Sequence, residues 1–86
     1  MREYAVTFVR SARKELEELP RSVVTRVVIR IESLGISPRP AGCRKLQGAA
    51  DLYRIRVGDY RVIYAVDDER HVVDVVAVRH RSDAYR

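Results

Sequence analysis

The 86-residue chain has little cysteine, histidine or lysine: one Cys, two His, and two Lys among 17 basic residues. A single cysteine excludes an internal disulfide, which small domains in oxidising compartments usually need, so we expect a cytoplasmic protein. Cys43, His71 and His80 fall short of the four ligands of a structural zinc site, and no glycine-rich phosphate loop is present. No apolar run approaches the ~18 residues that cross a bilayer, and the first residues do not resemble a signal peptide. We expect no metal, no cofactor and no membrane insertion.

Arginine is the residue that the chain has in excess. Fifteen arginines and two lysines face 12 acidic residues, which gives a net charge of +5. The planar guanidinium suits phosphate and carboxylate geometry, so this composition indicates a polyanionic partner. Hydrophobic residues make up 47% of the chain and charged residues 34%. That balance and the length predict one globular domain over residues 1–86.

The first half of the chain alternates a strand pattern with two helix patterns. Residues 4–9 alternate as a strand, and Ser11 is an expected N-cap for a short helix that ends before Pro20. Apolar residues at helical spacing predict a second helix over residues 21–34. Gly35 is then expected in the left-handed conformation that ends many helices. A connection rich in proline and glycine follows, up to residue 48.

The second half of the chain has the pattern of a strand meander. Residues 52–57 and 60–66 alternate around the two-residue turn Gly58-Asp59, and residues 72–78 form a third, more apolar run. The expected fold is an α+β two-layer domain. It has an N-terminal strand followed by two helices, and both helices pack on one face of an antiparallel sheet that the three-stranded meander completes.

The hairpin register predicts two chemically different faces. The turn sets Arg56 opposite Arg61 and Arg54 opposite Ile63. One face is therefore apolar and should cover the helices: it carries Tyr53, Ile55, Val57, Tyr60, Val62 and Tyr64. The other face carries three arginines, and like charges opposite each other destabilise a sheet. A nearby carboxylate, expected to be Asp74, would make this a solvated face, but three arginines on one rigid surface favour a phosphate-binding platform.

The C-terminal segment adds further candidates. Arg79 would extend the arginine surface, His80 titrates near neutral pH, and Tyr85 can stack on a base or move a proton. Lys45 lies in a connection that can close over the surface. Each has an ordinary alternative as an exposed, hydrogen-bonded or packing side chain.

Several segments together resemble the RelE/ParE family of toxins from prokaryotic toxin–antitoxin systems. The resemblance covers nearly the whole chain and rests on four segments, which are the Ala12-Arg-Lys-Glu-Leu16 helix, Lys45-Leu-Gln-Gly48, Tyr53-Arg-Ile-Arg-Val-Gly-Asp-Tyr-Arg-Val-Ile-Tyr64 and His80-Arg-Ser-Asp-Ala-Tyr85. It implies a small α+β toxin held inactive by a RelB-like antitoxin in a hetero-oligomer. RelE-like members cut messenger RNA in the ribosomal A site without a metal.

The resemblance also implies roles for individual residues. The catalytic candidates are Arg61, Arg79, Tyr85 and His80, and the RNA-binding candidates are Lys45, Arg54, Arg56 and Arg81. RelE-like enzymes often carry lysines where this chain has Arg54 and Arg56. Because arginine is a poor proton acceptor, the general base would be Tyr85 or His80.

Two other functions stay open at this stage. ParE-like members share the fold, inhibit DNA gyrase and commonly lack the constellation of Arg61, Arg79 and Tyr85, so its presence favours RNA cleavage. A basic sheet can also bind RNA without cutting it.

Overall fold

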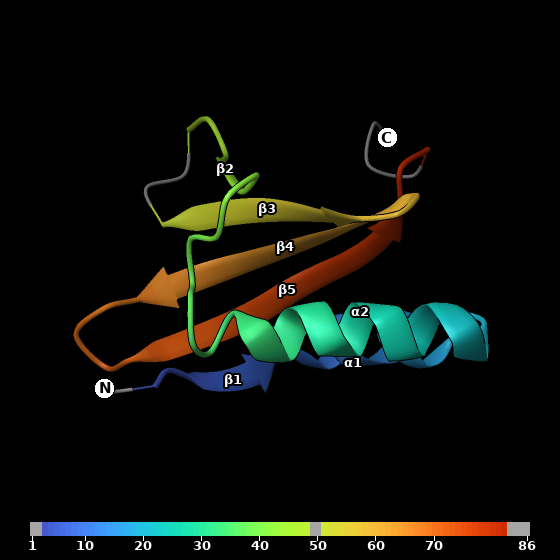
Figure 1. The fold of residues 1–86 in the computed structure, drawn as a ribbon, viewed down its shortest axis with the longest axis horizontal. Helices are drawn as coiled ribbons and strands as arrows, with labels where there is room; N and C mark the ends of the chain where they lie inside the picture. Colours follow the sequence, from blue (N-terminus) through green and yellow to red (C-terminus); the bar gives the residue numbers. More distant parts are fainter. Residues whose placement is uncertain (1–2, 49–50, 83–86) are drawn as a thin grey trace.

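The computed structural model describes residues 3–48 and 51–82. Two helices and five strands form in this part of the chain (Figure 1). Their bounds are β1 Ala5–Phe8, α1 Arg10–Glu17, α2 Arg21–Ser33, β2 Arg44–Lys45, β3 Leu52–Val57, β4 Tyr60–Asp67 and β5 Val72–His80. The predicted α+β architecture is confirmed, and the short β2 is an addition that the sequence did not indicate.

The five strands form one sheet in the order β1-β5-β4-β3-β2. The β3–β4 hairpin has the predicted register, with Arg56 opposite Arg61 and Arg54 opposite Ile63. The expectation of a wholly antiparallel sheet is wrong at one edge, because β1 pairs with β5 in parallel. β1 and β5 are the first and last of the five strands, so no hairpin turn connects them and they can run in the same direction.

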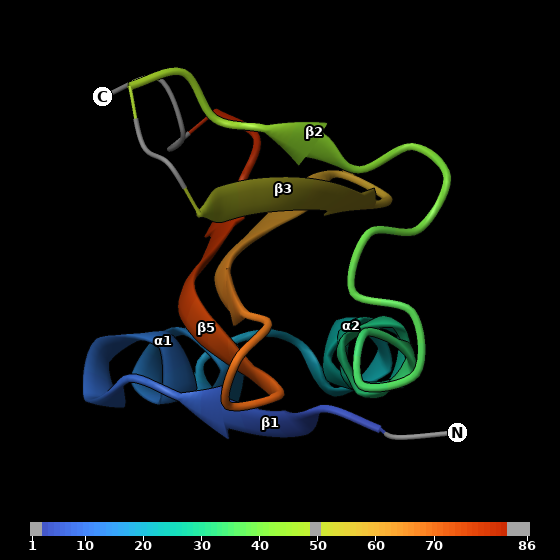
Figure 2. The ribbon, with the colours of Figure 1, turned by 90° about the vertical axis from the view of Figure 1, so that its left-hand side faces the viewer.

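The core lies between the two helices and one face of the sheet (Figure 2). Helix α1 contributes Ala12, and α2 contributes Val27 and Ile31, with Leu34 buried at its C-cap. The sheet contributes the alternate residues of three strands, namely Ile55, Val57, Val62, Tyr64, Val66, Val73, Val75 and Val78. This packing fixes which face of each strand is left for function.

Helix α1 lies beside β5, beyond the end of β1. It begins at Arg10, and Val9 at its N-cap makes no side-chain capping hydrogen bond, so the expected Ser11 cap is wrong. The amide of Val9 still donates to the carbonyl of Val75 at 3.0 Å, as a strand residue would. The chain therefore passes from strand to helix with no room for a separate capping residue.

Gly35 is needed for close approach rather than for a left-handed turn. The described residues with positive φ are Gly42, Gly48, Gly58 and His71, and Gly35 is not among them. The amide of Tyr4 donates to the carbonyl of Gly35 at 2.7 Å. A Cβ on Gly35 would lie 2.9 Å from the Tyr4 carbonyl oxygen, which is too close for any side chain.

The β4–β5 register places Asp74 away from the arginines of the hairpin. Asp67 pairs with Val72, so the turn occupies residues 68–71, and Asp74 comes opposite Ala65. The carboxylate of Asp74 accepts a hydrogen bond from Thr7 at 2.8 Å. Asp74 therefore does not offset the arginines of the hairpin.

A β-bulge then shifts the second half of β5. Tyr64 pairs with Val75 but Ile63 pairs with Ala77, so Val76 is the extra residue. Without the bulge, the register would set Arg79 opposite Tyr60. With it, Arg79 lies opposite Arg61. One inserted residue thus decides which face the side chain of Arg79 joins.

Candidate functional site

Three arginines lie in register across the middle of the sheet. Arg56 of β3 pairs with Arg61 of β4, and Arg61 pairs with Arg79 of β5. Because paired residues of neighbouring strands project on the same side, all three belong to the face away from α2. We call these three residues the arginine row. It concentrates positive charge on a surface that the strand backbones hold rigid.

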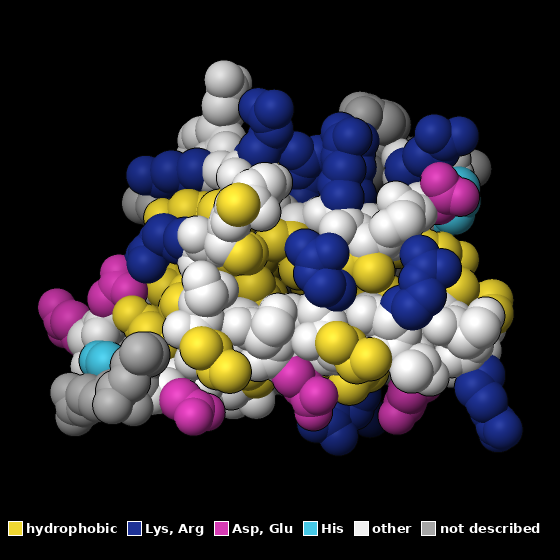
Figure 3. All heavy atoms as spheres, in the orientation of Figure 1, with side chains coloured by type: hydrophobic (Ala, Val, Ile, Leu, Met, Phe, Trp, Pro, Cys, Tyr) yellow, Lys and Arg dark blue, Asp and Glu magenta, His cyan; other side chains and the backbone are white. Residues whose placement is uncertain are grey.

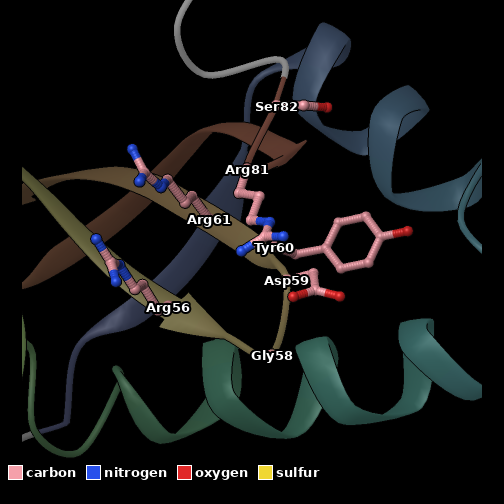
Figure 4. Close-up of a pocket in the computed structure, with 7 residues that line it drawn as sticks. All are labelled: Arg56, Gly58, Asp59, Tyr60, Arg61, Arg81 and Ser82. Atoms are coloured by element: carbon pink, nitrogen blue, oxygen red, sulfur yellow. The ribbon is translucent and has the colours of Figure 1, made fainter.

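A hollow of about 420 Å³ opens beside this row at the turn of the β3–β4 hairpin. Its lining consists of Arg56, Gly58, Asp59, Tyr60, Arg61, Arg81 and Ser82. Arg56 and Arg61 extend from neighbouring strands on the same side, and Arg81 lies beside them (Figure 4). We call this cavity the first hollow. Three of its seven lining residues are arginines and one is an aspartate, so the lining has an excess of positive charge that suits an anion.

The segment after β5 is tied to the hairpin turn. The amide of Arg81 donates to the carbonyl of Asp59 at 2.7 Å. Gly58 adopts φ +60°, as the glycine-first turn requires. Together these features bring a residue from the end of β5 to the hollow formed by the hairpin.

Arg79 is held by a helix residue. Its Nε donates to Oε2 of Glu15 at 3.1 Å, and Oε1 of the same carboxylate accepts the amide of Val78 at 3.0 Å. The bond to Val78 satisfies an amide of β5 that has no partner strand on that side, because β1 pairs with β5 only as far as Val75. Glu15 therefore both closes the sheet edge and orients Arg79, a role that its place in α1 did not reveal.

His80 belongs to the opposite face of the sheet. It pairs with Tyr60, and the two rings contact edge to face with centroids 5.3 Å apart. Its Nδ1 lies 2.9 Å from the Ser82 hydroxyl and accepts the Ser82 amide at 3.3 Å. His80 is therefore not part of the arginine row, but its two contacts, Tyr60 and Ser82, both line the first hollow. Tyr85 lies outside the described residues.

The remaining RNA-binding candidates divide between the two faces. Arg54 shares the face of the arginine row. Lys45 pairs with Tyr53 and so belongs to the other face, whereas its neighbour Arg44 pairs with Arg54. Arg44 is the residue that sequence reasoning missed, because only the short β2 sets it beside Arg54.

A different charge arrangement lies at the other end of β4. Asp68 accepts hydrogen bonds from Arg39 at 2.8 Å and from the hydroxyl of Tyr4 at 2.7 Å. Arg39 also donates to the hydroxyl of Tyr53 at 3.0 Å and lies over its ring. We call Tyr4, Arg39, Tyr53 and Asp68 the Asp68 clamp. It fixes the long connection before β2 against the sheet.

Hydrogen bonding in the clamp shifts the pKa values of Asp68 and Tyr4. The bonds from Arg39 and then Tyr4 hold the pKa of Asp68 below its usual value, because they stabilise the carboxylate. The bond to Asp68 raises the pKa of Tyr4. Beside the clamp, burial raises the pKa of Tyr64, whose hydroxyl donates to the Pro38 carbonyl at 2.7 Å.

Two features are absent from the part of the chain that the structure describes. Residues 3–48 and 51–82 contain no group of three or more His, Cys, Asp or Glu side chains placed to hold a metal ion. Neither helix in this part of the chain has the length and apolarity to cross a membrane.

Comparison with known proteins identifies the family. Residues 6–85 match the family model described as the ParE toxin of the type II toxin–antitoxin system parDE. Toxin RelG of Mycobacterium tuberculosis is 34% identical over 84 residues, which cover 96% of this chain and 97% of RelG. The mRNA interferase toxin RelE of Escherichia coli K12 is 35% identical over 86 residues, covering 95% of this chain and 90% of its own length.

The solved structures agree with the sequence comparisons. A chain of the archaeal RelE–RelB complex from Pyrococcus horikoshii superposes with a TM-score of 0.81 at 33% identity, over 92% of this chain and 96% of that one. The protein therefore belongs to the RelE/ParE family of toxins from type II toxin–antitoxin systems.

Proposed function

We propose that this RelE/ParE family member is the toxin of a type II toxin–antitoxin pair and cleaves messenger RNA as a metal-independent endoribonuclease. The observation that carries the proposal is the arginine row with the first hollow beside it, a rigid cationic surface suited to a phosphodiester. The relative from Escherichia coli that bears the name mRNA interferase toxin supports the same activity.

The proposed reaction is attack by a ribose 2′-hydroxyl on the adjacent phosphate. The new bond joins O2′ to phosphorus, the bond to the 5′-oxygen of the next nucleotide breaks, and that oxygen takes a proton from water. The products are a cyclic phosphate and a 5′-hydroxyl. Negative charge builds on the phosphorane oxygens. Arg61 and Arg79 stabilise that charge, and Arg54, Arg56 and Arg81 hold the RNA backbone.

The proton of the 2′-hydroxyl needs an acceptor other than arginine. Nδ1 of His80 lies within hydrogen-bond distance of both the hydroxyl and the amide of Ser82. We assign the acceptor role to Tyr85, as the family resemblance implies, with His80 as the alternative.

The partners follow from the same family. Solved relatives include toxins bound to RelB antitoxins. We propose a cognate RelB-like antitoxin in a hetero-oligomer, a cytoplasmic location, and cleavage in the A site of the ribosome. The ribosome would supply the alignment of the message that a chain of 86 residues provides only in part.

A second candidate is inhibition of DNA gyrase. It is favoured by the family model that matches residues 6–85, whose description names ParE. ParE-like toxins commonly lack the constellation of Arg61, Arg79 and Tyr85, so removal of Arg61 or Arg79 is expected to abolish RNA cleavage and to leave gyrase inhibition unchanged.

One paired experiment separates the two candidates. Purified toxin, freed of antitoxin, is added to ribosomes programmed with a defined message, and any cut is mapped. The same preparation is tested in a gyrase supercoiling assay. Cleavage within the A-site codon, absent on free RNA, is expected. Intact message with blocked supercoiling would overturn the proposal in favour of gyrase, and RNA binding without either effect would indicate a non-catalytic binding module.

A further inference from the structure

A second hollow of about 380 Å³ lies between α2, β2 and the outer edge of β3. It is lined by Arg30, Ala41, Gly42, Arg44, Arg54, Ile55 and Arg56. Four of these seven described residues are arginines and none is acidic. We call this cavity the second hollow. Figure 3 shows basic side chains gathered over β2 and β3 and over α2, with hydrophobic atoms exposed between them.

Three separate elements bring these arginines together. Arg30 comes from α2, Arg44 from β2, and Arg54 and Arg56 from β3. Arg44 and Arg54 are direct cross-strand partners, an arrangement that like charges disfavour.

The edge of the sheet also opens at this point. β2 is two residues long and pairs with Tyr53 and Arg54. The next residues of β3, Ile55 and Arg56, line the second hollow. The cavity is therefore a basic recess at a strand edge, with buried Ile55 as part of its wall.

Arg56 is shared by the two hollows, because it lines both of them. A linear polyanion that has one phosphate in the first hollow is thus guided over Arg56 into the second. Successive phosphates of one RNA strand have this linear arrangement. An isolated small anion would not need a continuous basic path.

We infer that the second hollow binds a backbone phosphate of the RNA strand that continues from the first hollow, with Arg30 and Arg44 as its specific ligands. The identity of the strand as RNA rests on the proposed function. The presence of a phosphate site rests on the four converging arginines. Arg30 and Arg44 contact the backbone only, so they contribute affinity without base preference.

The inference is tested by RNA binding with matched charge changes. The probe is a 2′-O-methyl hexaribonucleotide, which lacks the attacking hydroxyl and is bound without being cut. Dissociation constants are measured at several salt concentrations for the parent, for Arg30→Ala/Arg44→Ala, and for Arg21→Ala/Arg70→Ala. The last variant removes the same charge from exposed positions outside both hollows.

The second-hollow variant is expected to bind the probe about tenfold more weakly than the parent. The slope of log affinity against log salt should fall by about 1.4, as for two lost contacts to single-stranded RNA. The matched control should change affinity less than about twofold, since exposed charges far from the strand are screened. Thermal unfolding midpoints of both variants should equal that of the parent.

Equal losses of probe affinity in the two double variants would overturn the inference, and so would a parent protein that does not bind the probe. It would also be overturned if the second-hollow variant lost as much affinity for a hexaglutamate peptide as for the probe, because the hollow would then bind acidic chains in general. Failure of the proposed function is separate. In that case the parent protein leaves the programmed message intact. Selective loss of probe binding in the second-hollow variant would then still support a phosphate site.

Discussion

The two ends of the β3–β4 hairpin treat charge in opposite ways. At the end beside residues 68–71, the carboxylate of Asp68 is matched to the Arg39 guanidinium and the Tyr4 hydroxyl. At the end beside Gly58, Arg56 and Arg61 are direct neighbours and Arg81 joins them around a hollow. At the first end, the ion pair holds the connection before β2 against the sheet. At the second end, the excess of positive charge is suited to binding an external anion.

The comparison shows two uses of arginine in this fold. An arginine bonded to a carboxylate holds segments of the chain together, whereas several arginines around one hollow form a surface suited to an anion. Glu15 is an intermediate case, because it pairs with Arg79 at the margin of the arginine row. Substitutions at the arginine end should change activity with little effect on stability. Substitutions at the clamp should do the reverse.

Removing the central arginine of the row should have the largest effect. We expect Arg61→Ala to lower the single-turnover cleavage rate about 100-fold or more and to abolish growth arrest, because the phosphorane loses a preorganised cation. Rates are measured on programmed ribosomes, and folding is checked by the thermal unfolding midpoint. Arg70→Ala is the matched control, since Arg70 is 84% exposed and lies in the turn at the other end of β4 from the first hollow. A folded Arg61→Ala protein as toxic as the parent would show that the row is not catalytic.

An intermediate effect is expected from Glu15, a positioning residue for Arg79. Glu15→Gln keeps an oxygen for the Val78 amide but loses the charge that holds the Arg79 guanidinium. We expect kcat to fall about tenfold with KM and the thermal midpoint unchanged.

Glu15→Ala serves as the contrast, because it also removes the acceptor at the sheet edge. It should lower the thermal midpoint in addition to kcat. If both variants lost stability equally and kept the parent kcat, Glu15 would be a structural residue alone.

The smallest effect is expected from the clamp and concerns stability alone. The pKa of Asp68 is lowered in the folded state, so its ion pair stabilises the fold above the ordinary value of 3.8 and this contribution is lost as pH falls through the lower folded pKa. Asp68→Asn should therefore be less stable than the parent near neutral pH, and the difference should shrink in acid. Urea unfolding of both proteins at several pH values measures it. RNA cleavage by Asp68→Asn should equal that of the parent, and a constant stability difference across the acid range would contradict the assignment.

The amino-acid sequence by itself determined the hairpin register and the sorting of its side chains. A two-residue turn at Gly58 fixes which residues face each other, and the strand period of two then places Arg54, Arg56 and Arg61 on one face and the core residues on the other. The helical spacing of Val27, Ile31 and Leu34 was equally sufficient, because burial follows directly from periodicity.

Only the tertiary structure decided the rest of the site. The bulge at Val76 sets Arg79 opposite Arg61, and the sequence carries no signal for it, because its position depends on how two complete strands pair. The contact of Glu15 with Arg79 joins residues 64 positions apart. Arg30 and Arg44 meet Arg54 only through the packing of α2 and the short pairing of β2. Local patterns specify the face of a strand, whereas contacts between distant segments exist only once the core has brought those segments together.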